Sequence, residues 1–174
     1  MNPQAGSIFL NRARYLLTTE YRTKLRLAVE ALPEGEIWTR ANARSNSVGN
    51  LLLHLTGNVR QWLITGVGGA PDVRQRAAEF AAKGGPTRAE LLARLNQTLD
   101  EVEHVFDSLT DESLVQQRTI QGREMTVLDA IFSCVEHFAQ HLGQIILIAK
   151  VHSPEAIRFY EDAGGTAYPV WKSR

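Results

Sequence analysis

The sequence has little of what marks several large classes of protein. Its 174 residues include a single cysteine, Cys134, so an internal disulfide is excluded and a reducing cytoplasm is the expected location. Lysine and arginine balance aspartate and glutamate at 19 each, which gives no electrostatic reason to expect nucleic acid as a partner. No uninterrupted apolar run of about 18 residues exists, and the N-terminal segment lacks a signal-peptide layout, so no membrane association is expected.

What is present is the composition of an ordinary globular protein, with a length that suits one domain over residues 1–174. Apolar residues recur at helical spacing in several long segments, and Thr87 and Thr126 each precede an acidic residue by three positions, as in a capping box. The predicted helices cover residues 7–32, 47–65, 87–108 and 126–152. Because no convincing series of strands accompanies them, the predicted fold class is all-α, a four-helix bundle.

Two connections are unusually long for such a bundle, at residues 66–86 and 109–125. The first can contain a short helix at 73–83 and is long enough to return along the bundle, so the second and third helices need not be antiparallel. The second connection can form a small hairpin around Gly122. The tail at 155–174 is expected to be irregular from Gly164 onward and to pack on the body or on a dimer partner.

Two of the predicted helices carry a strip of uncharged polar residues where a solvent-exposed face would normally carry lysine and glutamate. Such strips suit a half-buried polar pocket, in which each polar group finds a partner. The strip on the 47–65 helix consists of Ser47, Asn50, His54, Asn58, Gln61 and Thr65. The strip on the 126–152 helix consists of Thr126, Ser133, His137, Gln140, His141 and Gln144.

His137 and His141 are four residues apart, about one helical turn, so both imidazoles lie on one helix face. If the two strips face each other, His54 joins them, and three neutral imidazoles with one open position are typical of a catalytic zinc-type site. The neighbouring polar side chains would then orient the ligands or contact substrate. Those candidates are Asn50, Asn58, Gln140, Gln144 and, for an anionic substrate group, Arg60.

Other interpretations of these histidines remain open from the sequence. His54 can be a hydrogen-bonded core histidine, and the His137–His141 pair can occur without any metal. A fourth protein ligand, from Cys134 or His104, would make the site closed and structural. A zincin-type protease is disfavoured, because no glutamate stands in the H-E-x-x-H arrangement.

The segments SVGNLLLHLTGNVRQWL and TVLDAIFSCVEHFAQHLGQI resemble the DinB/YfiT-like superfamily of small metal-binding bundles. This resemblance implies a four-helix bundle of up-down-down-up topology, often dimeric, with zinc or nickel on His54, His137 and His141. It is nearest to a subgroup described only loosely as metal-dependent enzymes. Superfamily members of known chemistry include thiol transferases that use bacillithiol and a mycothiol-dependent maleylpyruvate isomerase.

The leading functional hypothesis is therefore a metal-dependent enzyme, a thiol transferase or a hydrolase, that acts on a small molecule. Its open coordination position would take a low-molecular-weight thiol, water or a substrate oxygen. The competing hypothesis is a non-catalytic metal-binding or stress-response homodimer, in which the metal stabilises the bundle.

Overall fold

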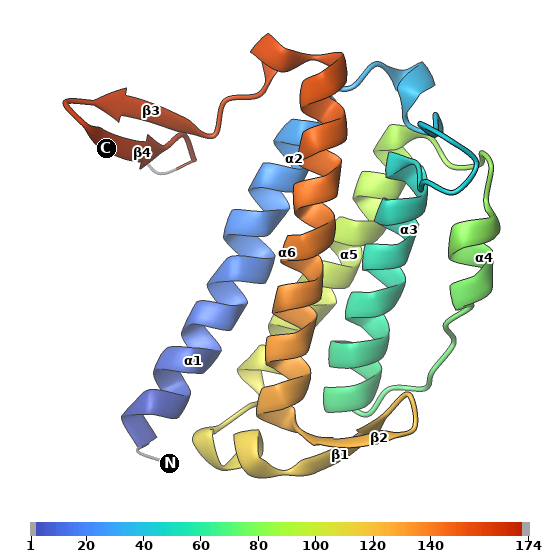
Figure 1. Cartoon of the computed structure of the whole chain (residues 1–174). Coiled ribbons are helices and arrows are strands. Elements are labelled where there is room, and N and C mark those ends of the chain that lie inside the picture. Colours follow the sequence, from blue (N-terminus) through green and yellow to red (C-terminus); the bar gives the residue numbers. More distant parts are fainter. Residues whose placement is uncertain (1–2, 172–174) are drawn as a thin grey trace.

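The computed structural model describes residues 3–171 and consists mostly of helices that lie side by side (Figure 1). The all-α class is thereby confirmed. The first long helix combines α1 (Pro3–Tyr15), a π-helical segment η1 (Leu16–Tyr21) and α2 (Arg22–Glu30). The second combines α3 (Val48–Val59) and a π-helical segment η3 (Arg60–Val67). Then come the short α4 (Arg76–Ala81) and the long α5 (Arg88–Asp107) and α6 (Val127–His152). Three 3-10 turns are η2 (Glu34–Glu36), η4 (Asp111–Val115) and η5 (Pro154–Ala156).

The starts of three helices follow directly from local sequence. Ser47, Thr87 and Thr126 each accept a hydrogen bond from the backbone N–H three residues later, and each pairs with the side chain at that position as a capping box. The residues at those third positions are Asn50, Glu90 and Asp129. These reciprocal bonds satisfy N–H groups that the first turn of a helix leaves without intrahelical partners.

In Figure 1 the α1–α2 helix and α6 rise toward one end of the molecule, whereas α3 and α5 descend toward the other. α3 packs against both α5 and α6, and α2 packs against α6. The core between them is apolar and closely filled. Fully buried side chains include Leu17, Leu25, Leu52, Leu55, Leu95, Leu99 and Phe138.

The parallel course of α3 and α5 requires a connection that returns along the bundle. Residues 68–87, here called the strap, make this return and contain α4, which lies beside α3 in Figure 1. The Asn50 amide donates to the Glu79 and Ala82 carbonyls at 2.9 and 2.8 Å. The Arg40 guanidinium donates to the Phe80 and Ala82 carbonyls at 2.9 and 2.8 Å. The side chains of Asn50 and Arg40 therefore hold the strap against α3 and the segment before it.

The predicted hairpin in the second connection is confirmed as β1 (Gln117–Ile120) paired antiparallel with β2 (Arg123–Thr126). Its turn places Gln121 at φ 53° and Gly122 at φ 73°, the left-handed values that a tight hairpin turn of this kind requires. The pairing sets Gln117 opposite Thr126 and Ile120 opposite Arg123, and Ile120 is buried. The turn is thereby carried back toward η3, which packs against β1.

The tail is more regular than expected, because β3 (Tyr160–Ala163) and β4 (Thr166–Pro169) form a second antiparallel hairpin. The prediction of irregular structure from Gly164 was wrong, since Gly164 and Gly165 at φ 66° and 84° supply a tight turn. Beyond the hairpin, the Trp171 ring centroid lies 5.3 Å from Lys24 Nζ, and Trp171 Nε1–H donates to the Tyr15 hydroxyl at 3.5 Å. The tail thus contacts the first helix. Residues 172–174 of the predicted tail lie outside the described residues.

Within residues 3–171, α6 is the one helix that is long and apolar enough to cross a membrane by length and composition. A core helix passes the same test, and one side of α6 is buried against the other helices. Its buried residues are Val127, Ala130, Ile131, Cys134, Phe138, Leu142, Ile145 and Ala149.

Replacing Asn50 with alanine should destabilise the protein by about 2–4 kcal/mol, because the change removes the bonds that Asn50 Oδ1 accepts from Ser47 in the α3 capping box and two buried bonds to the strap. Thr87→Ala is the matched control, since it removes only a cap and should cost about 1 kcal/mol. Urea unfolding measures both changes. Equal losses of unfolding free energy in the two variants would show that the bonds from Asn50 to the strap do not stabilise the protein.

Candidate metal centre

Three histidines from two helices converge at one point in the bundle. His54 comes from α3, and His137 and His141 come from successive turns of α6. His54 Nε2 lies 2.9 Å from His137 Nε2, the ring centroids are 4.5–5.0 Å apart, and the possible ligand atoms all lie within 4.8 Å of one another. His54 is 3% exposed, whereas the two histidines of α6 are half-buried. The two polar strips therefore face each other.

The strap adds a carboxylate to this cluster. Glu79, only 8% exposed, places Oε2 2.9 Å from His54 Nδ1. A carboxylate oxygen can only accept a hydrogen bond, so the contact with Glu79 places the proton on Nδ1, and the Arg74 Nη2 that lies 3.1 Å from Nδ1 donates to Glu79 Oε2 instead. His54 Nε2 is then the unprotonated nitrogen, and it faces the other two imidazoles. This carboxylate–histidine pairing is the arrangement that fixes the tautomer of metal-binding histidines in proteins.

Arg74 holds the carboxylate in place. Its Nε and Nη2 donate to the two oxygens of Glu79 at 2.8 and 2.9 Å, a bidentate pair. Its Nη1 donates to Gln61 Oε1 at 2.9 Å. Burial alone would raise the pKa of Glu79, but the bonds from Arg74 and His54 outweigh it and lower that pKa. Glu79 is therefore ionised, and both of its carboxylate oxygens accept hydrogen bonds.

The histidines of α6 are also prepared as neutral ligands. His141 Nδ1 lies 3.1 Å from Gln144 Oε1, which can accept a hydrogen bond from Nδ1–H and leave the unprotonated Nε2 for the cluster. Burial, followed by the neighbouring His141 and His54 and the nearby guanidinium groups, lowers the pKa of His137 to about 4. Burial likewise lowers the pKa of His141. Neutral imidazole is the form that binds a metal, because protonation removes the donor lone pair.

This donor set fits a divalent metal ion. Nitrogens bound at about 2.0–2.1 Å to one tetrahedral metal lie roughly 3.4 Å apart, so the His54 and His137 rings need to separate by only a few tenths of an ångström. Zinc and nickel both accept imidazole nitrogen. Within residues 3–171 the cluster contains these three histidines and no fourth ligand. The residues would thus hold the ion on one side and leave another side open.

The open side adjoins a pocket of about 290 Å³. His54 and His137 form part of its wall, together with side chains from α3, η3, the strap, the β1–β2 turn and α6. The other lining residues are Asn58, Trp62, Arg74, Arg76, Gln121, Ser133, Glu136 and Gln140. A small molecule that occupies this pocket would touch the histidine cluster.

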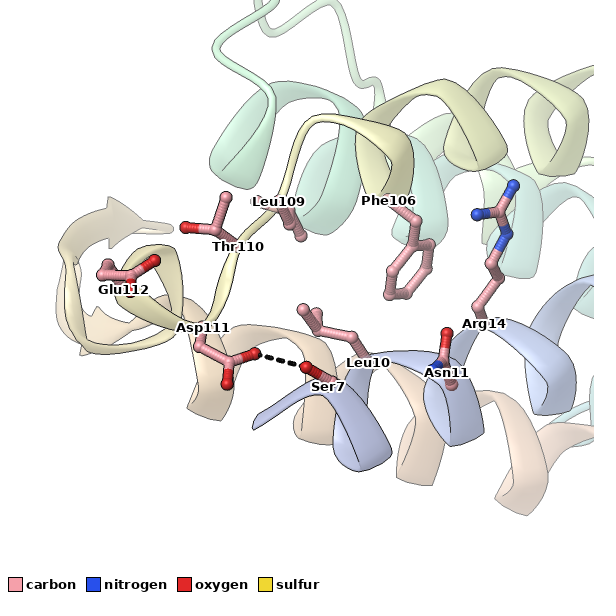
Figure 2. A pocket seen from close by; sticks show the side chains of 9 residues that line it. All are labelled: Ser7, Leu10, Asn11, Arg14, Phe106, Leu109, Thr110, Asp111 and Glu112. Atoms are coloured by element: carbon pink, nitrogen blue, oxygen red, sulfur yellow. Dashed lines mark hydrogen bonds between the residues drawn. The ribbon is translucent and has the colours of Figure 1, made fainter. Parts of the chain in front are cut away.

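A larger pocket of about 450 Å³ lies elsewhere, between α1, the end of α5 and η4 (Figure 2). Some of its polar groups are paired: Ser7 Oγ donates to Asp111 Oδ1 at 2.9 Å, and Arg14 forms ion pairs with Glu103 and Asp107. No histidine lines it, and the three-histidine cluster is not part of it. The candidate chemistry therefore belongs to the smaller pocket.

The structure distributes the other predicted residues among different roles. Asn58 lines the histidine pocket, and Gln144 contacts His141. Asn50 is fully buried and holds the strap that carries Glu79, so it acts on the cluster only through that segment. Arg60 forms an ion pair with Glu101 and does not line the pocket.

The two residues considered as a fourth ligand stand outside the cluster. Cys134 is buried, its Sγ lies 4.0 Å from Asn58 Oδ1, and burial raises the pKa of its thiol to about 12. His104 is exposed on α5. Neither belongs to the group of ligand atoms that the three histidines form.

Sequence reasoning missed Glu79, Arg74 and Arg76, all of which come from the strap. The unusual length of that connection was the available signal, since long loops without structure of their own are often functional. Nothing in the local sequence indicated that Glu79 would reach a histidine 25 residues earlier in the chain.

The metal-free protein should lose stability as the pH falls from about 6.5 toward 4. The pKa of His137 lies near 4 in the folded protein and near 6.5 in the unfolded chain, so only the unfolded chain binds this proton in that interval. His137→Asn should reduce the loss, and Gln140→Asn, on the same helix, should retain the wild-type dependence. Urea unfolding at several pH values, in the presence of a chelator, measures how the free energy of unfolding depends on pH. An unchanged pH dependence in His137→Asn would contradict the assignment.

Comparison with known proteins places the chain in a family. Residues 4–159 match a family model described as "Protein of unknown function (DUF1572)". No curated protein matches the chain. Because the match includes the strap and all three histidines, the site described above lies within the family domain. The chain belongs to the DUF1572 family of proteins of unknown function.

Proposed function

We propose that this protein is a metal-dependent enzyme that acts on a small molecule, as a thiol transferase or a hydrolase. One observation carries the proposal: three imidazoles converge beside an open polar pocket, with no fourth protein ligand among the described residues. A zinc or nickel ion held there would lower the pKa of a thiol or water molecule in its remaining position. A purely structural metal site is normally closed by a fourth ligand, which disfavours the non-catalytic alternative.

In this proposal the protein residues have separate tasks. Glu79 fixes the tautomer of His54, and Gln144 fixes that of His141. Asn58 and Gln140 offer amide groups to a molecule in the pocket. Glu136 supplies the carboxylate among the lining residues and would accept the proton that an incoming thiol or water releases.

We also propose a topology for the helix bundle. The rising and descending helices of Figure 1 agree with an up-down-down-up four-helix bundle of the DinB/YfiT type, the superfamily that the two histidine-bearing segments resemble.

We further propose a homodimer. Ile8 and Phe132 are 62% and 58% exposed on α1 and α6. Beside Phe132 is an apolar hollow of about 180 Å³ between Phe9, Leu16 and Val135.

The purified protein should contain about one zinc or nickel ion per chain, and a His54→Ala, His137→Ala double variant should contain none. Elemental analysis by mass spectrometry measures the metal. Gln140→Ala, which leaves the three imidazoles intact, should retain it. Equal metal in the double variant and the wild type would rule out the cluster as the site.

Replacing Glu79 with glutamine should weaken metal binding about 10- to 100-fold, because the neutral amide no longer fixes the His54 tautomer. Competition with a chromophoric chelator gives the affinity. Glu101→Gln is the matched control, since Glu101 pairs with Arg60 outside the pocket. Wild-type affinity in a folded Glu79→Gln variant would show that the carboxylate does not support the site.

A further inference from the structure

The histidine pocket contains two arginines, and only one of them is engaged. Arg74 directs its guanidinium nitrogens to Glu79 and Gln61, so its charge is already neutralised. The exposed side chain of Arg76 makes no hydrogen bond or ion pair with any residue in the described part of the chain, yet it lines the same pocket. Its cation therefore faces the pocket without a protein anion.

Arg76 is nevertheless held in position. Its guanidinium carbon lies 5.0 Å from the centroid of the Phe80 ring, a cation–π contact, and the Phe80 ring lies 4.6 Å from that of His54. The aromatic face supports the guanidinium group without using its N–H donors. The Phe80 ring thus lies between the Arg76 guanidinium group and His54, and the guanidinium N–H groups have no protein acceptor among the described residues.

A second donor in the pocket also lacks a partner. Trp62, from η3, lines the pocket, and its Nε1 is buried without a hydrogen-bond acceptor among residues 3–171. Buried indole N–H groups are normally hydrogen-bonded, so an isolated one indicates an acceptor that the protein chain itself does not supply. The pocket therefore offers one cation and one buried donor beside the imidazoles.

We infer that the ligand of this pocket carries a carboxylate, bound by Arg76 and, after a shift of the Trp62 side chain, by its indole N–H, at the end away from the group that occupies the open side of the cluster. A carboxylate accepts paired hydrogen bonds from a guanidinium group and has a further lone pair for the indole. Glu136 lines the same pocket and repels an anion, so the carboxylate lies on the strap side. This inference rests on the proposed metal function and specifies its substrate class.

The test uses the cobalt-loaded full chain and two probes, 3-mercaptopropionate and 2-mercaptoethanol. Both bear a thiol on a two-carbon chain, which ends in a carboxylate in the first and a hydroxyl in the second. Absorption from thiolate bound to cobalt follows each titration. The wild type should bind 3-mercaptopropionate at least about tenfold more tightly, since charge-assisted bonds are the stronger kind.

Arg76→Gln should abolish this preference, because the affinity for 3-mercaptopropionate should fall more than that for 2-mercaptoethanol. Trp62→Phe, which removes the N–H and keeps an aromatic ring, should reduce the preference about two- to tenfold. Glu136→Gln should increase the preference, because it removes the repulsion. Arg26→Gln is the matched control, since Arg26 pairs with Glu30 on the first helix and does not line the pocket.

Equal affinities for the two probes in the wild type, or a full preference in Arg76→Gln, would overturn the inference while leaving the metal site intact. Failure of the wild type to bind cobalt would instead refute the proposed function. In that case each probe is titrated into the metal-free protein, and its binding is followed by Trp62 fluorescence. The Trp62→Phe variant gives the background signal of the other tryptophans. Quenching by 3-mercaptopropionate alone would support the carboxylate site, and equal responses to both probes would exclude it.

Discussion

The buried carboxylate of Glu79 connects the fold to the candidate site. An ionised group loses its hydration when it is 8% exposed, and that loss is tolerable only when strong partners replace the water. Arg74 supplies two charge-assisted bonds from within the strap, and His54 supplies one from α3. Removal of any one partner would leave a buried charge incompletely paired. The conformation of the strap and the tautomer of His54 are therefore stabilised by the same interaction.

This coupling explains why a six-residue helix in a long connection retains a defined position. α4 has one buried residue, Glu79, and an isolated helix of that length is unstable in water. Its backbone carbonyls instead accept hydrogen bonds from the side chains of Asn50 and Arg40, which belong to α3 and to the segment before it. Gly57 on α3 permits the approach, because a Cβ there would overlap the Glu79 carboxylate. The bundle thus provides the surface on which the strap becomes ordered.

Much of this architecture could be predicted from local patterns. Helical spacing and capping boxes located the long helices, and two uncharged polar strips indicated His54, His137 and His141, which the structure brings together. Local patterns do not specify which distant carboxylate pairs with which imidazole. Glu79 was missed because a glutamate on a short amphipathic stretch resembles any solvent-exposed acid. Arg60 was a candidate for the pocket because it borders the strip, but its partner Glu101 lies on α5.

The elements that surround the histidine cluster determine the side on which it is open. α3 and α6 provide the three imidazoles, and the strap closes the His54 side with Glu79 and Phe80. The buried thiol of Cys134 faces Asn58, so the α6 helix offers no fourth ligand there. What remains is the wall formed by η3, the start of α4 and the β1–β2 turn, where Gln121 donates to Gln61 at 2.7 Å. Any molecule that reaches the histidines from the pocket therefore meets side chains of the two connections as well as those of the helices that carry the histidines.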